Sequence, residues 1–284
     1  MHLRLQSAME YLMTYGWGLL LIMIVIIALF ELGLFNASNF MPKAEAGACA
    51  VFKGVQGINL EGQCNNEIPK FVGQFSGTGS SILMSSSSSL NASYITMAAW
   101  VDPSSYNCAS DHCIILNKEN QYEMAMTDGT GAFNAALDPS WAWYGPSNPL
   151  PVGQWSFVAI TWNGITQDYY INGYLAYSIS AGSGPITPTN NCLRIGARGG
   201  CSSAGSLFPG DIADVQLYNT TLSANQIYSI YVEGIGGIPI SPAYIAGWWP
   251  LNGNANDYSG NENNGAASGG VSYSSAWTSG YTVP

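Results

Sequence analysis

The chain has few charged side chains, and very few of them are basic. Of its 284 residues, 8% are charged, and 7 Lys plus Arg stand against 17 Asp plus Glu, which gives a formal net charge of -10. A surface that binds nucleic acid needs clustered basic side chains, so this composition disfavours nucleic acid as a partner. No C-x-x-C spacing occurs and the 2 histidines, His2 and His112, lie outside any cluster of metal ligands, which leaves zinc binding as the weaker interpretation of the 6 cysteines.

A second absence marks the N-terminal part of the chain. No charged residue occurs from Leu12 to Phe30, a run that nearly spans a hydrocarbon core of about 30 Å as an α-helix. Apart from His2, Arg4 is the only basic residue before Lys43, which places the N-terminus inside the cell and everything after residue 40 outside. The run is longer than the core of a secretory signal, and no A-x-A-like site follows it. We expect a long hydrophobic helix over residues 6–40.

The start of this run resembles a known signal. Gln6-Ser-Ala-Met-Glu10-Tyr-Leu is similar to the archaeal class III signal of type IV pilin-like proteins, although their usual Lys-Gly is Arg4-Leu5 here. The resemblance implies that residues 1–5 are a signal peptide, that a prepilin peptidase cuts between Leu5 and Gln6, and that the helix waits in the membrane before assembly. It also implies that Glu10 neutralises the α-amino group of a neighbouring subunit in a filament of identical chains. The alternative is an uncleaved signal anchor.

The cysteines and the glycosylation motifs all lie on the predicted external side. The cysteines form three close pairs in sequence, and three local disulfides are the simplest of the fifteen possible pairings: Cys49/Cys64, Cys108/Cys113 and Cys192/Cys201. Three sequons are compatible with surface glycosylation, at Asn36, Asn91 and Asn219.

Beyond the helix the chain reads as an all-β head. Residues 41–70 form a neck with a small disulfide-containing segment, and residues 71–284 alternate short apolar runs with Gly, Ser and Asn turns, which is typical of two packed antiparallel sheets. The predicted strands are Phe71–Phe75, Ser93–Val101, Cys113–Leu116, Tyr122–Met126, Ala132–Leu137, Trp155–Trp162, Asp168–Ile171, Tyr174–Ile179, Leu193–Ile195 and Ile212–Tyr218. Asn172-Gly173 predicts a two-residue hairpin turn.

One helix interrupts the strand pattern. Leu222–Tyr231 carries Ser223 and Gln226 at capping-box spacing, with apolar residues on one face. We expect the core of the head to contain Trp100, Trp155, Trp162 and one of Trp248 and Trp249.

Several motifs in this order resemble the concanavalin A-like, laminin G-like lectin and glucanase superfamily. They are Phe75-Ser-Gly-Thr-Gly-Ser-Ser with Tyr94–Val101, Gly153–Thr161 with Tyr170-Ile-Asn-Gly-Tyr174, and Gly210–Tyr218 followed by Leu222-Ser-Ala. The resemblance implies an antiparallel jelly-roll sandwich over about residues 71–233.

The segment 247–273 looks like the first strand and first loop of that family, displaced to the end of the chain. Because the termini of such sandwiches lie close together, the strand can return to its own sheet. The alternative is that it enters the head of a neighbouring subunit.

Catalytic groups are missing as well. Glucanases of this superfamily carry an E-x-D-x-x-E strand, because retaining glycosidases need two carboxylates about 5 Å apart. The pattern does not occur, and the nearest pair, Asp211 and Asp214, is expected to point to opposite faces of a strand. We therefore expect a protein that is not an enzyme.

Two binding sites remain as predictions. Asn254, Asp257, Asn261 and Asn264 supply the oxygen ligands that Ca²⁺ prefers, with an empty Asn/Gly turn as the alternative. Trp141, Trp143 and Tyr144 could bind a sugar ring, cap the sandwich or lie between packed heads. The sequence thus favours a subunit of an archaeal pilus-like filament at the cell surface that displays a lectin-like head for adhesion, with a monomeric membrane-anchored adhesin that binds glycans as the alternative.

Overall fold

The structure, a computed structural model, describes residues 15, 17–18, 20–27, 51–54, 57–60, 68–108 and 110–284. The chain divides into two units, Met1–Lys43 and Ala44–Pro284. In the first unit every described residue is helical, and the apolar side chains of residues 20–27 are all exposed, by 48% or more. The rest of the predicted helix, with Leu5, Gln6, Glu10 and Asn36, lies outside the described residues. Within the described part of the chain, no helix is both long and apolar enough to cross a membrane.

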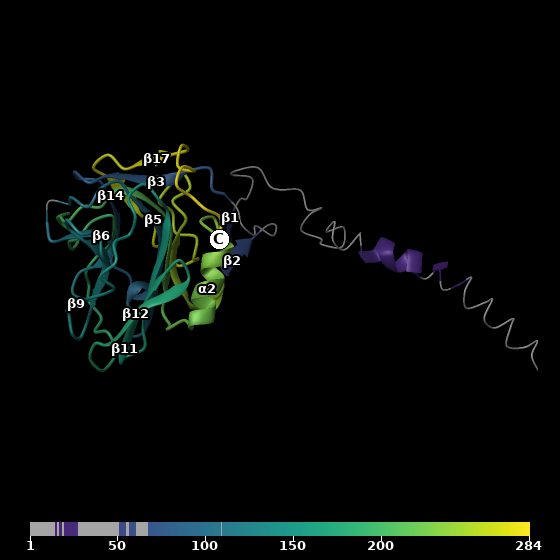
Figure 1. Cartoon of the computed structure of the whole chain (residues 1–284). Coiled ribbons are helices and arrows are strands. Elements are labelled where there is room, and N and C mark those ends of the chain that lie inside the picture. The colour runs from purple at the N-terminus through teal and green to yellow at the C-terminus, as the bar shows by residue number, and fades with distance from the viewer. Residues whose placement is uncertain are drawn as a thin grey trace, which may run out of the picture. The chain divides into compact units, whose positions relative to one another are not determined.

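The second unit is a sandwich of two large antiparallel sheets (Figure 1). The eight-stranded sheet runs in the order β12 (Tyr174–Ser180), β11 (Thr166–Ile171), β10 (Ser156–Trp162), β5 (Ile95–Pro103), β14 (Pro209–Tyr218), β3 (Val72–Ser76) and β17 (Ser272–Ser274), and β15 (Ile245–Trp249) also pairs with β14. The seven-stranded sheet runs β16 (Ala266–Ser268), β4 (Ser81–Met84), β13 (Leu193–Ile195), β6 (His112–Lys118), β7 (Tyr122–Thr127), β8 (Phe133–Leu137) and β9 (Trp143–Tyr144). A separate hairpin joins β1 (Val51–Gly54) to β2 (Gly57–Leu60).

Every predicted strand overlaps a strand of these sheets, so the all-β antiparallel sandwich is confirmed. β10 lies between β5 and β11 and is buried at every position, as its continuous apolar pattern predicts. Asn172 and Gly173 turn the β11–β12 hairpin with φ of 50° and 79°, the left-handed conformation that this turn requires. The strands that the sequence did not reveal are short: β4, β9, β16 and β17 have two to four residues each.

The helix α2 (Ala224–Glu233) begins with the predicted capping box between Ser223 and Gln226. Its buried residues, Ile227 and Ile230, belong to an apolar layer on the outer face of the eight-stranded sheet. In Figure 1, α2 lies on one side of the head, and β6 and β9 of the other sheet lie on the opposite side. Among the described residues of the head, Ser88–Leu90 and Pro242–Tyr244 also form short 3-10 turns.

The eight-stranded sheet therefore has apolar layers on both of its faces. The core between the sheets contains Trp162 and Trp249, whereas the outer layer contains Trp100, Trp155 and Trp248. The expectation that only one of Trp248 and Trp249 would be buried is wrong: both are at most 2% exposed. Successive residues of a strand project from opposite faces of the sheet. Both faces of this sheet contact an apolar layer at β15, so Trp248 and Trp249 are both buried.

The displaced segment completes its own head. β15 pairs with β14, β16 with β4 and β17 with β3, all within one chain. Insertion into a neighbour's head is thus not the arrangement of this structure, and the three strands add to both sheets of the same sandwich.

The loop after β15 is held by one buried carboxylate. The two carboxylate oxygens of Asp257 accept hydrogen bonds from the backbone N–H groups of Trp248 (3.0 Å), Ser259 (2.8 Å) and Asn263 (2.9 Å) and from the Ser259 hydroxyl (2.9 Å). Asp257 is 2% exposed. Buried donors are costly when they lose their acceptor, so this side chain stabilises the whole turn.

We predict that Asp257→Ala leaves three buried N–H groups without an acceptor and destabilises the head by about 3–5 kcal/mol, which lowers Tm by about 10 °C in a domain of this size. Thermal unfolding followed by circular dichroism measures this. Asn256→Ala, one position earlier and exposed, is the matched control and should leave Tm nearly unchanged. Equal Tm values for the two variants would show that the Asp257 contacts do not hold the loop.

Candidate binding site

Four polar side chains form a row across neighbouring strands of the eight-stranded sheet. Asp102 of β5 lies opposite Asp211 of β14, Asp211 lies opposite Gln74 of β3, and Gln74 lies opposite Ser272 of β17. Residues that are paired in register project from the same face of a sheet. On β5, β14 and β3, the residues two positions away on the same face are Trp100, Ala213 and Val72, which belong to the apolar layer under α2. The polar row therefore lies on the outer face of the sheet, next to this apolar layer.

The row lines a cavity of about 490 Å³. Ser76, Ser104, Gly153 and Gly270 contribute other parts of its wall. The Ser272 hydroxyl donates to Gln74 Oε1 at 3.2 Å, and Gln74 forms a further side-chain hydrogen bond with Asp211. Since Asp211 at neutral pH can only accept, Gln74 donates its amide N–H to it, which sets the orientation of the amide.

The two carboxylates face each other without a basic neighbour. Burial, and to a smaller extent the charge of Asp211, raise the pKa of Asp102 from 3.8 to about 6, against the backbone N–H groups of Gly153 and Gln154, which lower it. Burial also raises the pKa of Asp211 from 3.8 to about 6, against the hydrogen bond from Gln74. Asp102 Oδ1 is buried and has no hydrogen-bond partner. Directly opposed carboxylates repel each other, and the Oδ1 of Asp102 is an acceptor that no described group of the protein satisfies.

The sequence pointed to Asp211 but paired it with the wrong residue. Asp214 is 2% exposed and accepts from the Trp248 indole N–H and the Gln216 amide, both at 2.7 Å, and burial raises its pKa to about 7. A bulge between Ala213 and Gln216 breaks the alternation on which the expected opposite faces rested. Asp102 was missed because it is distant in sequence. The sequence signal that could have indicated this pair is that Asp102 lies near the end of the β5 run and Asp211 near the start of the β14 run.

The seven-stranded sheet carries a second polar cluster on its outer face. Glu123 is fully buried, forms an ion pair with Arg198 Nε at 3.1 Å and accepts from the Asn117 amide at 2.8 Å. Burial raises its pKa to about 7, which the charge of Arg198 opposes. Arg198 lies within the loop that the Cys192–Cys201 disulfide closes and also pairs with Glu119. Because Glu123 is covered, we assign this cluster to holding the segment onto the sheet.

The aromatic segment does not form one continuous exposed platform. Tyr144 packs against the core between the sheets, whereas the Trp143 ring stacks on His112 with centroids 3.8 Å apart and 12° between the planes. Trp141 lies in a turn with φ of 46°, and all three rings are half-buried. Sugar binding by Trp141, Trp143 and Tyr144 stays a prediction, and Trp143 is the member that lies over the outer face of the seven-stranded sheet.

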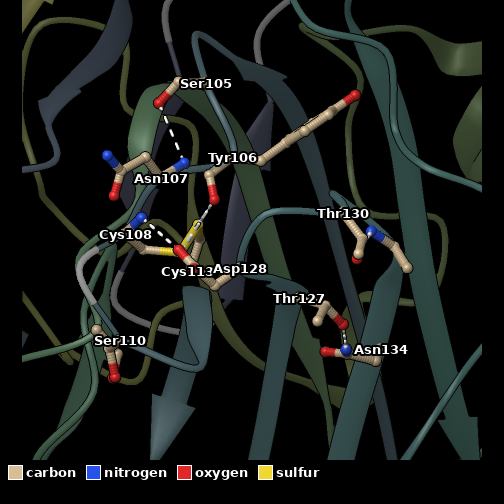
Figure 2. Close-up of a disulfide and its surroundings, with 12 residues drawn as sticks. Ser105, Tyr106, Asn107, Cys108, Ser110, Cys113, Thr127, Asp128, Thr130 and Asn134 are labelled. Atoms are coloured by element: carbon tan, nitrogen blue, oxygen red, sulfur yellow. Dashed lines mark hydrogen bonds between the residues drawn. A yellow bond between two sulfur atoms is a disulfide. The ribbon is translucent and has the colours of Figure 1, made fainter.

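A disulfide holds the loop that leads to His112. Figure 2 shows Cys108 bonded to Cys113, with the Cys108 N–H donating to Asp128 Oδ1 at 2.8 Å. Cys192 and Cys201 are bonded as well, so two of the three predicted pairs are present. Cys108, Cys113 and Asp128 lie close enough to suggest a metal site, but the two sulfurs are bonded to each other, which argues against the zinc interpretation here. Cys49 and Cys64 lie outside the described side chains.

The other predicted site residues lie on separate surfaces. In the predicted calcium loop, Asp257 accepts four hydrogen bonds, Asn254 and Asn264 accept backbone N–H groups, and Asn261 donates to the carbonyl groups of Ile245 and Ala246. These oxygens are engaged within the loop and do not form a set that fits a hard cation, so calcium binding gains no support and stays a prediction. Asn219 is exposed and Asn91 is half-buried, and their glycosylation also stays a prediction.

The fold defines a laminin G-like β-sandwich of the lectin type. Residues 76–228 match the laminin G-like family of the concanavalin A-like lectin/glucanases superfamily, and the chain belongs to this superfamily. A comparison with curated proteins found no match.

Solved structures agree on the fold. A candidate carbohydrate-binding protein from Bacteroides ovatus is 20% identical, with a TM-score of 0.59 over 72% of this chain and 60% of that one. The chain thus spans 60% of the length of the Bacteroides protein, and at this identity the likeness concerns the fold alone. A heptameric SAP-like pentraxin from Limulus polyphemus is 16% identical, with a TM-score of 0.49 over 75% of this chain and 96% of that one, which is too low to carry further weight.

We predict that Asp211→Asn stabilises the head at neutral pH. A carboxylate whose pKa is raised on folding contributes stability below its unfolded pKa of 3.8 and loses it as the pH rises through about 6, so the charged pair costs stability at neutral pH. Removing one charge should raise Tm by about 1–3 °C near pH 7.5 and change it little near pH 4.

Thermal unfolding at the two pH values, with the exposed Asp111→Asn as control, measures this effect. A lower Tm for Asp211→Asn near pH 7.5 would contradict the repulsion between Asp102 and Asp211.

Proposed function

We propose that the head is a glycan-binding module whose binding site is the cavity lined by Asp102, Asp211, Gln74 and Ser272. The observation that carries this proposal is the row of hydrogen-bonding side chains, in register across four strands, at the wall of a cavity of about 490 Å³. Small-molecule sites typically enclose about 300–1,000 Å³ and contain a few convergent polar groups. Membership in a superfamily of lectins and glucanases supports glycans as the ligand class.

Sugar hydroxyls match the groups of this cavity. Each carboxylate oxygen can accept a hydrogen bond from a hydroxyl, and Asp102 Oδ1 has no partner from the protein. The Gln74 side chain lies between Asp211 and Ser272 in the row, and its contacts to both residues orient the amide. Strands rather than flexible loops position all four side chains, which favours binding by a preformed site.

The same carboxylates are poorly arranged for hydrolysis. A glycosidase needs one carboxyl group that is protonated and one that is ionised, and it achieves this by pushing their pKa values apart. Burial raises the pKa of both Asp102 and Asp211 to about 6, which sets neither of them apart as the proton donor, and the E-x-D-x-x-E pattern of the glucanases is absent from the sequence. We therefore infer binding without bond cleavage, in line with the expectation from the sequence.

We predict that Ser272→Tyr abolishes glycan binding, because its ring fills the cavity without altering either carboxylate. Binding of the purified full chain to a glycan array, followed by isothermal titration with the best ligand, measures this. Ser275→Tyr, exposed and outside the cavity wall, should bind as the unsubstituted chain does.

Trp143→Ala tests the competing site. Loss of binding in Trp143→Ala together with full binding in Ser272→Tyr would move the glycan to the outer face of the seven-stranded sheet and overturn the cavity proposal.

We further propose that the N-terminal helix mounts this head on a type IV pilus-like filament outside the cell. The support is the Gln6–Leu12 motif, the uncharged run from Leu12 to Phe30, and the exposure of every apolar side chain in residues 20–27 of the single chain. Such a surface needs lipid or neighbouring helices to cover it. A carboxylate at Glu10 is costly in lipid alone and is stabilised by the α-amino group that cleavage before Gln6 creates.

We predict that mature subunits begin at Gln6 and that cells carry filaments containing this chain. Glu10→Gln should be cleaved normally but yield few filaments, because the neutral amide cannot pair with the α-amino group. Mass spectrometry of the N-terminus and electron microscopy of sheared filaments measure both. An intact Met1 on a monodisperse membrane protein would instead support the anchored monomer.

A further inference from the structure

The cavity with Asp102 and Asp211 holds two negative charges close together and no positive one. Directly opposed residues on antiparallel strands have Cβ atoms about 4.5–5.5 Å apart, so a single small group can contact both carboxylates. Among the residues that the structure describes, no basic side chain lines this cavity. We propose that the glycan bound here carries a protonated primary amine, as an amino sugar does; this inference rests on the proposed function and names the class of its ligand.

The basic side chains of the head that the structure describes are engaged elsewhere. Lys118 donates to Thr189, Arg194 donates to Gly200 and Ser81, and Lys70 lies over the Phe71 ring. Arg198 pairs with Glu119 and Glu123 on the other sheet. Together with the net charge of -10, this leaves the cavity as a site of negative potential that the protein does not neutralise.

An ammonium group satisfies this site better than a hydroxyl does. It supplies three N–H donors and a positive charge, so it can donate to both carboxylates and cancel their repulsion, whereas a neutral hydroxyl supplies one donor and leaves the repulsion in place. Asp102 Oδ1, buried and without a partner, gains most from such a donor. Ser76, Ser104 and Ser272 also line the wall, and the Ser272 hydroxyl, which donates to Gln74, can still accept from a hydroxyl group of the sugar ring.

A bare metal ion fits the same groups less well. Calcium takes six to eight oxygen ligands at about 2.3–2.6 Å, but the Gln74 amide donates to Asp211. This donor occupies a position that a cation would need. The cavity of about 490 Å³ is also far larger than one ion requires.

The experiment compares three ligands that share one ring: the methyl glycosides of glucosamine, glucose and N-acetylglucosamine, titrated into the full chain near pH 7.5. We expect the glucosamine glycoside to bind at least about tenfold more tightly than the other two, the value of a charged hydrogen bond over a neutral one. Asp102→Asn and Asp211→Asn, which keep the shape of the site, should remove this preference. The preference should also shrink near pH 5, where the carboxylates gain protons.

The outcomes separate this inference from the proposed function. Equal affinity for the three glycosides, with binding still abolished by Ser272→Tyr, would overturn the amine and keep the glycan site. A glucosamine preference that survives in both Asn variants would overturn the role of the carboxylates. Titration with calcium chloride that gives heat in the unsubstituted chain but none in Asp102→Asn would assign the site to a metal and overturn the amine. Failure of all glycosides and of the array to bind would overturn the proposed function itself.

Discussion

The hydrogen bond from the Trp248 indole to the buried Asp214 carboxylate joins the end of the chain to the middle of its larger sheet. Asp214 sits in a bulge of β14 with φ of 47°, and this bulge divides the strand: the part before it pairs with β3 and the part after it with β15. β14 also pairs with β5 along most of its length. Three strands, β3, β5 and β15, thus pair with β14. The hydrogen bond between Trp248 and Asp214 holds β15 beside the bulge and so fixes where the last part of the chain joins the larger sheet.

The same bulge positions the candidate binding site. Before it, Asp211 keeps the outward alternation of β14 and lies opposite Asp102 and Gln74. After it, β15 brings Trp248 into the outer apolar layer under α2. The outer face of the eight-stranded sheet is thus divided between a covered apolar region and an open polar one. The cavity lies in the open region, where two carboxylates that cost stability at neutral pH are retained, a pattern more typical of a binding site than of a structural one.

The prediction from sequence succeeded where the signal was local. Strands with clear apolar runs, such as β10, and the capped helix α2 were found because period and capping are properties of a few neighbouring residues. The short strands β9, β16 and β17 were missed, since their pairing is supplied by the neighbouring strand rather than by their own composition. The disulfides at Cys108–Cys113 and Cys192–Cys201 followed from closeness in sequence. The burial of both Trp248 and Trp249 did not follow, because it needs apolar layers on both sides of one sheet.

The sequence by itself determined the class of the head, an acidic all-β sandwich with local disulfides, because composition, alternation and turn residues act over short distances. The displaced first strand was implied by the resemblance to the lectin superfamily. The sequence also supplied the hypothesis of a filament, which rests on the motif around Glu10. Only the tertiary structure decided that β15 returns to its own sheet and that Asp211 meets Asp102, residues more than one hundred positions apart, rather than Asp214. Strand order and register decide which residues lie opposite each other, and both depend on pairings between distant segments that no local pattern encodes.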